Sequence, residues 1–191
     1  LIAAPDRGTD INTLIANNII EVALASQSED GRRSLSARLR LALFIAPELD
    51  FGHLLLAQEL SDVGQYEEAI LHLDRIDVDD VFGQLAQLLK ASIIENMDDP
   101  ERAVSILEAV IIRNRDNPYL YHRVGDNYRR MQRYAESRDA YMKAMALGSD
   151  SGALHRNLGM ALERLGDDLA AETHLLRAVE IDPSDSYALN Y

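Results

Sequence analysis

The stretch of residues 118–151 reads PYLYHRVGDNYRRMQRYAESRDAYMKAMALGSDS. Within it, Tyr121, Val124, Gly125 and Tyr128 stand at i, i+3, i+4 and i+7, which places them on one stripe of an α-helix. After a turn at residues 132–133, a second stripe runs through three further residues: Ser137, Tyr141 and Ala144. The stretch therefore predicts two helices joined by a short turn, each with one face to bury.

The same pattern returns every 34 residues along the chain. One column holds small side chains, a second holds alanine or glycine, and a third holds large ones: Ala69, Ala103, Ser137 and Ala171; Ala57, Ala91, Gly125 and Gly159; Leu73, Leu107, Tyr141 and Leu175. A hairpin of two helices cannot bury both stripes alone, so such hairpins stack on one another. Glycine inside a helix costs about 1 kcal/mol relative to alanine, so we expect close packing at Gly125 and Gly159.

The last two frames of this repeat resemble the tetratricopeptide repeat family. They carry its motif as Tyr121-x₂-Val124-Gly125-x₂-Tyr128…Ser137…Tyr141…Ala144 and as Leu158-Gly159-x₂-Leu162…Ala171…Leu175…Ala178…Pro183. The resemblance implies an all-α fold, a right-handed superhelical solenoid of about five helix-turn-helix units. It predicts a single domain over residues 1–191, in frames 16–49, 50–83, 84–117, 118–151 and 152–185.

Two of the frames depart from the family pattern, and the last residues of the sequence begin a further unit without completing it. Leu35 stands where a small residue is expected, residues 26–33 predict a longer loop, and Lys90 stands where the family prefers leucine. Residues 186–191 predict the start of one further helix that stops early. Because solenoids normally end in a polar capping helix, we expect a fragment of a larger protein whose C-terminal end can self-associate.

A looser similarity links the chain to multi-repeat proteins of alphaproteobacteria. It rests on the order of the repeats and on the segments around Arg38–Ala42, Ala46–Leu49 and Tyr187–Tyr191. It favours a bacterial periplasmic or cell-envelope location, with the cytoplasm as the alternative.

Composition and motifs exclude several classes of function. The net charge of −13 argues against nucleic-acid binding, which requires a basic surface. No apolar run reaches the roughly 20 residues that span a bilayer, which argues against membrane insertion. The absence of cysteine removes thiol catalysis and most structural zinc sites. No phosphate-binding loop, Gly-x-Ser-x-Gly or His-Glu-x-x-His motif occurs. We therefore expect neither an enzyme nor a cofactor.

Two clusters carry metal-site hypotheses, and for both we favour the plainer interpretation. His122 and His155 lie on the first helices of adjacent frames and give two ligands at most, so surface or partly buried imidazoles are the alternative. Four aspartates lack the glycine and the terminal glutamate of a calcium-binding loop, and predict a solvated turn with a helix cap: Asp74, Asp77, Asp79 and Asp80.

The family resemblance also implies a binding surface. In tetratricopeptide proteins, the first helices of successive units line a concave groove that takes a peptide or a partner helix. In frames 4 and 5 these positions are Tyr119, His122, Arg123, Asp126, Arg129, Arg130, Arg156, Asn157, Met160 and Arg164. In frames 1 to 3 they are Ile20, Leu24, Phe51, Leu54, Leu55, Leu85 and Leu88. For the apolar set, burial in the core is the alternative.

Charge is unevenly distributed over these frames. Residues 50–112 hold 3 basic and 14 acidic side chains, a net of −11, whereas residues 113–151 hold 8 basic and 5 acidic ones, a net of +3. Arginine binds carboxylates through a planar fork, so the basic end suits an acidic or C-terminal segment. Alternatively, the arginines pair within the protein with Asp126, Glu136, Asp139 and Glu163. A lysine and asparagine carboxylate clamp is disfavoured, because the lysine is missing beside Arg123 and Asn157.

These observations favour a non-catalytic protein-protein interaction scaffold, which binds a partner peptide or helix in its concave groove. Two alternatives stay open. One is an assembly segment that docks through its C-terminal edge onto a copy of itself or onto further repeats. The other is a regulatory domain of a larger enzyme.

Overall fold

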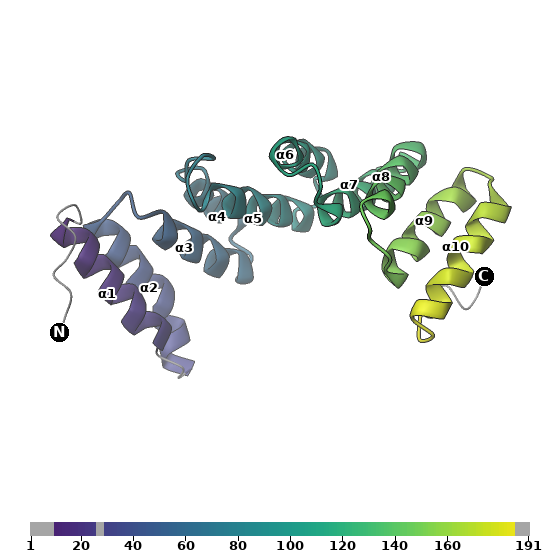
Figure 1. The fold of residues 1–191 in the computed structure, drawn as a ribbon. Helices are drawn as coiled ribbons and strands as arrows, with labels where there is room; N and C mark the ends of the chain where they lie inside the picture. Colours follow the sequence, from purple (N-terminus) through teal and green to yellow (C-terminus); the bar gives the residue numbers. More distant parts are fainter. Residues whose placement is uncertain (1–9, 26–28, 186–191) are drawn as a thin grey trace, which may run out of the picture. The chain divides into compact units, whose positions relative to one another are not determined.

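The computed structural model describes residues 10–25 and 29–185, with the side chains of residues 29–34 left aside. In these ranges every regular element is a helix, in the order α1 (Ile11–Ala25), α2 (Glu29–Ile45), α3 (Asp50–Asp62), α4 (Tyr66–Leu73), α5 (Gly83–Asn96), α6 (Pro100–Arg113), α7 (Pro118–Arg130), α8 (Tyr134–Ala146), α9 (Gly152–Arg164) and α10 (Asp168–Ile181) (Figure 1). The all-α prediction is confirmed.

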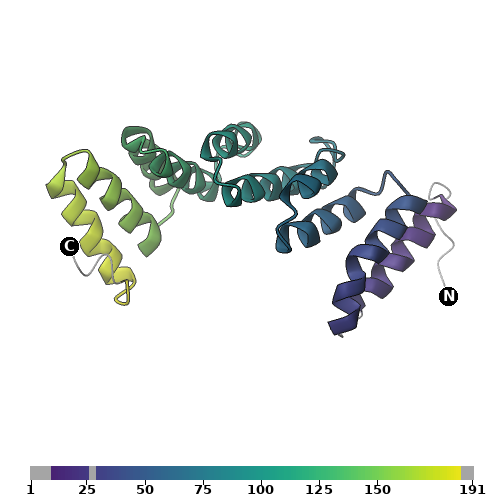
Figure 2. The ribbon, with the colours of Figure 1, turned by 180° about the vertical axis from the view of Figure 1, so that it is seen from behind.

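The helices pack as hairpins of consecutive elements, visible from both sides in Figures 1 and 2: α1 with α2, α3 with α4, α7 with α8 and α9 with α10. The first helices α3, α5, α7 and α9 begin within one residue of the predicted frame starts. The first frame differs, because α1 begins at Ile11. The longer loop predicted over residues 26–33 was wrong from Glu29 onward, where α2 begins.

The chain divides into two compact units, an N-terminal unit of residues 1–93 and a C-terminal unit of residues 94–191. Each unit is described by itself below. The single domain inferred from the repeat stays a prediction, and the truncated helix expected over residues 186–191 lies outside the described residues.

Close helix contacts explain the two glycines in the middle of helices. A Cβ atom on Gly125 would lie 2.5 Å from the ring of Tyr141, and one on Gly159 would lie 2.7 Å from Cγ of Leu175. The Ser137 hydroxyl donates a hydrogen bond to the Gly125 carbonyl oxygen at 2.8 Å, which holds α7 and α8 at this short distance. The packing predicted from the repeat is confirmed at both glycines.

The turns between α3 and α4, α5 and α6, α7 and α8, and α9 and α10 share one backbone conformation. The residues with positive φ include four spaced 34 positions apart: Gly64 at 78°, Asp98 at 61°, Gln132 at 59° and Gly166 at 80°. This left-handed region is free of strain for glycine and costs other residues roughly 1–2 kcal/mol. Two of the four turns therefore carry backbone strain.

Replacing Gln132 with glycine should stabilise the protein by about 0.5–1 kcal/mol, because relief of the left-handed strain exceeds the entropy that glycine gains in the unfolded chain. Gln132 is exposed, so little side-chain contact is lost. Urea unfolding followed by circular dichroism measures the change. Gln132→Ala is the matched control, since it removes the side chain and keeps Cβ; an equal gain in both variants would contradict the explanation.

Candidate functional site

Helix α7, in the C-terminal unit, carries six of the ten concave residues predicted in frames 4 and 5. It begins at Pro118, and the Asn117 side chain caps it by accepting a hydrogen bond from the Tyr119 amide at 3.1 Å. Leu120 and Val124 are buried on its inner face. The polar residues of the helix consequently fall on its other faces.

A hollow of about 500 Å³ opens beside α7, and we call it the α7 hollow. Its walls come from the end of α5 and from the outer side of α7: Glu95, Asn96, Tyr119, His122, Arg123, Asp126, Asn127 and Arg130. Five of the predicted concave residues therefore lie around one cavity, namely Tyr119, His122, Arg123, Asp126 and Arg130.

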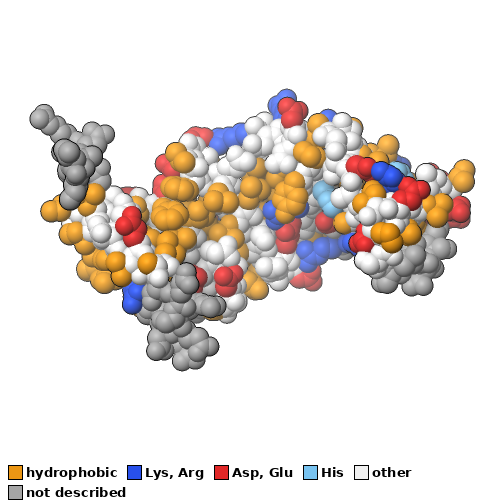
Figure 3. All heavy atoms as spheres, turned by 60° about the horizontal axis from the view of Figure 1, so that its bottom comes forward, with side chains coloured by type: hydrophobic (Ala, Val, Ile, Leu, Met, Phe, Trp, Pro, Cys, Tyr) orange, Lys and Arg blue, Asp and Glu red, His pale blue; other side chains and the backbone are white. Residues whose placement is uncertain are grey.

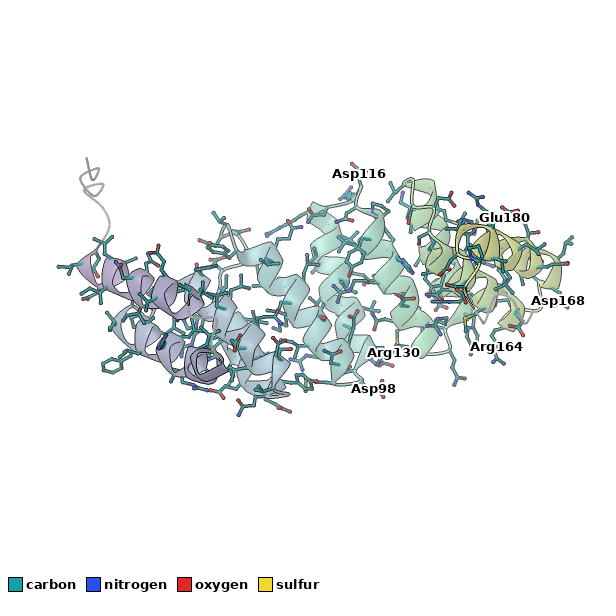
Figure 4. The ribbon with its side chains drawn as sticks, turned by 90° about the horizontal axis from the view of Figure 1, so that it is seen from below. Asp98, Asp116, Arg130, Arg164, Asp168 and Glu180 are labelled. Atoms are coloured by element: carbon teal, nitrogen blue, oxygen red, sulfur yellow. The ribbon has the colours of Figure 1, made fainter. Side chains whose placement is uncertain are left out.

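Glu95 organises one wall of the α7 hollow. Its Oε2 atom accepts a hydrogen bond from Nη2 of Arg123 at 2.6 Å, and its Oε1 atom accepts one from Nδ2 of Asn127 at 2.7 Å. Arg130 donates to the Glu95 backbone carbonyl at 3.0 Å and pairs with Asp98, beside it in Figure 4. Sequence reasoning missed Glu95, because the side chain comes from the end of the preceding first helix.

Asp126 also lines the hollow, and its side chain joins three helices. Its Oδ1 atom accepts hydrogen bonds from the Tyr141 hydroxyl of α8 at 2.7 Å and from Nδ2 of Asn157 of α9 at 2.8 Å. The rings of His122 and Tyr141 meet in a T-shaped arrangement, with ring centroids 5.6 Å apart. Burial, and next the Asp126 carboxylate, raise the pKa of Tyr141 above its usual value, so the phenol stays a hydrogen-bond donor.

Three buried polar atoms of α7 have no hydrogen-bond partner within the described residues: Nε2 of His122, Oδ1 of Asn127 and Nε of Arg129. Asn127 is only 1% exposed. A buried polar group without a partner costs roughly 1–3 kcal/mol. Asn127 and His122 line the α7 hollow, whereas Arg129 does not. The wall of the hollow thus contains one acceptor without a partner in the described ranges, Oδ1 of Asn127, and a ring nitrogen, Nε2 of His122, whose neighbour Oδ2 of Asp126 is 3.8 Å away.

The predicted residues of α9 extend this surface. Arg156 pairs with Asp185 at 2.7 Å, and Asn157 is buried against Asp126. Met160 is half-buried. Arg164 is exposed at the end of α9, labelled in Figure 4, and no ion pair is recorded for it among the residues that the structure describes.

Internal pairing of the arginines, the alternative to a free basic surface, is present in the structure. Arg133 pairs with Glu136 and Arg138 with Asp139, two of the carboxylates expected from the sequence. The concave arginines use other partners: Arg123 pairs with Glu95, Arg130 with Asp98 and Arg156 with Asp185. The basic charge of this end is therefore largely balanced inside the protein.

The apolar residues predicted for the groove divide between core and surface in the N-terminal unit. Ile20 and Leu54 are buried, 2% and 7% exposed, as the core alternative requires. Phe51 is half-buried and its ring lies 5.6 Å from that of Phe82. The others are exposed or half-buried: Leu24, Leu55, Leu85 and Leu88. Hydrophobic side chains are prominent over this unit in Figure 3.

The structure does not form the His122–His155 pair that the sequence analysis considered and disfavoured. His155 does not pair with His122; its Nδ1 atom lies 2.9 Å from Nδ1 of His174, on the second helix of the same hairpin. The hypothesis of a His122–His155 site compared only first helices and so did not consider a partner on the second helix. In the described part of the chain, no group of three or more histidine and acidic side chains is arranged to hold a metal ion. No helix described here is both long and apolar enough to cross a bilayer.

Comparison with known proteins agrees with the repeat geometry. Residues 116–184 match the family model described as "Tetratricopeptide repeat". This segment of the chain therefore carries tetratricopeptide repeats. A search among curated protein sequences gives no significant match.

Solved structures of tetratricopeptide repeat proteins share the fold. MamA 41-end from Desulfovibrio magneticus RS-1 is similar with a TM-score of 0.77 and 18% identity, over 93% of this chain and 98% of that one. A second MamA structure gives 0.76 and 20%, over 92% and 94%. YrrB, a tetratricopeptide protein with an unusual peptide-binding site, gives 0.74 and 13%, over 95% and 97%. At these identities the likeness concerns the fold.

Proposed function

We propose that this tetratricopeptide repeat protein is a non-catalytic scaffold, which binds a peptide segment of a partner protein at the α7 hollow. Repeat proteins of this kind use the surface along their first helices for binding. The peptide-binding site of YrrB, a protein of similar fold, agrees with this function.

The observation that carries the proposal is Oδ1 of Asn127, a buried acceptor in the wall of the hollow that has no hydrogen-bond partner among the described residues. A peptide supplies both N–H donors and C=O acceptors along its backbone. Its amide can donate to Asn127 Oδ1, which no group of the described protein does. Tyr119, 61% exposed at the rim, offers an aromatic surface of the kind enriched in binding sites.

The charges around the hollow bear on the sequence-based idea of an acidic ligand. Arg123 and Arg130 contribute two positive charges, and Glu95 and Asp126 contribute two negative ones. An acidic segment would have to compete with Glu95 for Arg123, at an existing N–O distance of 2.6 Å. A peptide of low net charge fits this arrangement better, and a preference for acidic residues stays a prediction for the basic end as a whole.

The test is selection of a phage-displayed library of random peptides on the immobilised protein, followed by affinity measurement for a selected peptide. Tyr119→Ala should weaken binding about tenfold or more, the usual effect of removing an aromatic anchor. Leu169→Ala is the matched control, because Leu169 is 78% exposed on α10 and outside the hollow. Equal affinities for the wild type and Tyr119→Ala would overturn the proposed site.

A further inference from the structure

Two histidine pairs occupy equivalent positions in two repeats. In the N-terminal unit, Nδ1 of His53 on α3 lies 2.9 Å from Nδ1 of His72 on α4, with ring centroids 5.1 Å apart. In the C-terminal unit, His155 on α9 and His174 on α10 have the same two distances. The offsets are 155 − 53 = 102 and 174 − 72 = 102, which is three repeats of 34 residues. Both pairs join the two helices of one hairpin.

The outer nitrogen of each first-helix histidine is also engaged. Nε2 of His53 lies 2.8 Å from the carbonyl oxygen of Pro47, and Nε2 of His155 lies 2.8 Å from Oδ1 of Asp150. Both rings are buried, 3% and 5% exposed. Their orientation is therefore fixed at both nitrogens, by the segment before the helix and by the second helix of the hairpin.

The hydrogen-bond partners of the first pair limit the number of protons that it can hold while the bond between the two rings is kept. The Pro47 carbonyl can only accept, so Nε2 of His53 carries a proton, and in the neutral ring Nδ1 is an acceptor. Nδ1 of His72 must then donate the proton between the rings. One additional proton can go to Nε2 of His72 without disturbing this bond. A second would go to Nδ1 of His53 and place two N–H groups against each other, so the bond would be lost.

The second pair follows the same rule with a different outer partner. The carboxylate of Asp150 accepts from His155 and also from Nη2 of Arg177 at 2.8 Å. Its negative charge lies beside the pair, on the side of His155. If both rings of this pair carried a proton on Nδ1, the two N–H groups would face each other across 2.9 Å. Both hairpins thus accept at most one extra proton with the bond intact.

Charged neighbours around the first pair nearly offset one another. Asp50 lies on α3 and Glu68 on α4, while Arg40 of α2 pairs with Glu68 at 2.7 Å, and Arg75 follows α4. Glu68 is the negative neighbour that raises the pKa of His72, and it is shared with Arg40. Around the second pair, the charged neighbours are Asp150 and Arg177. Helix α8 contributes the uncharged Met145.

We propose that the two histidine pairs are proton-sensitive latches, which hold the hairpins α3–α4 and α9–α10 closed at neutral pH and loosen them in acid. The direction follows from linkage. Burial, and next the charge of the partner ring, lower the pKa values of His72 and His174 in the folded protein. The unfolded chain takes up protons from about pH 6.5, before the folded one does. Stability is lost as pH falls below this value, down to the lowered pKa values.

Hydrogen exchange of backbone amides, expressed as protection factors at about pH 7.5 and about pH 5, tests the latches. We expect protection in α3–α4 and α9–α10 to fall about tenfold in acid, the effect of one lost charge-sensitive contact. Protection in α7–α8 should change far less, because His122, the histidine of these helices, is not paired with another histidine. A uniform fall over all helices would overturn the proposal.

Each pair also provides the control for the other. His174→Asn keeps an N–H donor near the Nδ1 position and cannot be protonated, so it should abolish the acid response of α9–α10 and leave that of α3–α4. His72→Asn should do the reverse. An acid response that persists in the substituted hairpin contradicts the latch. Should a variant fail to fold, long-range ¹H–¹⁵N spectra of the wild type decide: the first pair requires Nε2–H on His53 and Nδ1–H on His72, and other tautomers overturn it.

Discussion

Replacing Gly125 with alanine is expected to destabilise the C-terminal unit by about 2 kcal/mol, although alanine is the better helix former by about 1 kcal/mol. The new methyl group would lie 2.5 Å from two ring atoms of Tyr141. The ring is fully buried, and its hydroxyl is bonded to Asp126, so it cannot move aside without breaking that bond. Urea unfolding and thermal melting by circular dichroism measure the loss.

A second substitution separates this clash from other effects. In the Tyr141→Leu background the ring is absent, so adding Gly125→Ala should cost little or even stabilise through helix propensity. Tyr141→Phe is the companion control, because it keeps the ring and should keep the penalty. If Gly125→Ala destabilises all three backgrounds equally, the ring contact is not the cause.

The substitution Glu95→Gln should destabilise α7 by about 2–3 kcal/mol, because it removes the charge that Arg123 and Asn127 share. The Arg123 side chain is only 12% exposed and the Glu95 side chain 21%, so water cannot easily replace the carboxylate. Because the pair is partly buried, the loss should persist at high salt. Hydrogen exchange of the α7 amides, combined with urea unfolding, measures it.

The neighbouring pair of Arg130 and Asp98 is the matched control for Glu95. Asp98 is 86% exposed, and a surface ion pair contributes about 0–1 kcal/mol. Asp98→Asn should therefore change stability by less than the Glu95 substitution and should lose its effect in salt. Equal losses for both substitutions would show that burial does not govern this network.

The fold could be predicted from periodicity because repeat packing is local. Positions that repeat every 34 residues are those whose side chains pack together inside a hairpin. The contact between Gly125 and Tyr141 is one example. Helix ends were harder in the first frame. There α2 begins at Glu29, inside a polar segment that periodicity alone predicts as a loop.

The candidate site was predictable only in part, because its geometry depends on side chains from different helices. The stripe on α7 indicated Arg123 and Arg130, yet their partners Glu95 and Asp98 lie 28 and 32 residues earlier in the chain. Charge counting over a segment cannot show such pairs. Leu54 illustrates the same limit, since a rotation of one helix position separates a groove residue from a core residue.

The two histidine pairs could have been predicted from the sequence, because the spacing of their residues repeats. His53 and His72 recur as His155 and His174 with the same spacing of 19 residues. That spacing joins a first helix to its own second helix. Comparing first helices with each other, as the idea of a His122–His155 site did, overlooks it.

The four left-handed turns have a consequence for how this chain can vary through mutation. At Asp98 and Gln132, a change to glycine lowers backbone strain, whereas at Gly64 and Gly166 almost any change raises it. Substitution at these positions is therefore directional: glycine is easily acquired and hardly lost. Over long divergence, such turns would accumulate glycine unless another requirement opposes it. At Asp98 one is visible, because its carboxylate holds Arg130 at the rim of the α7 hollow.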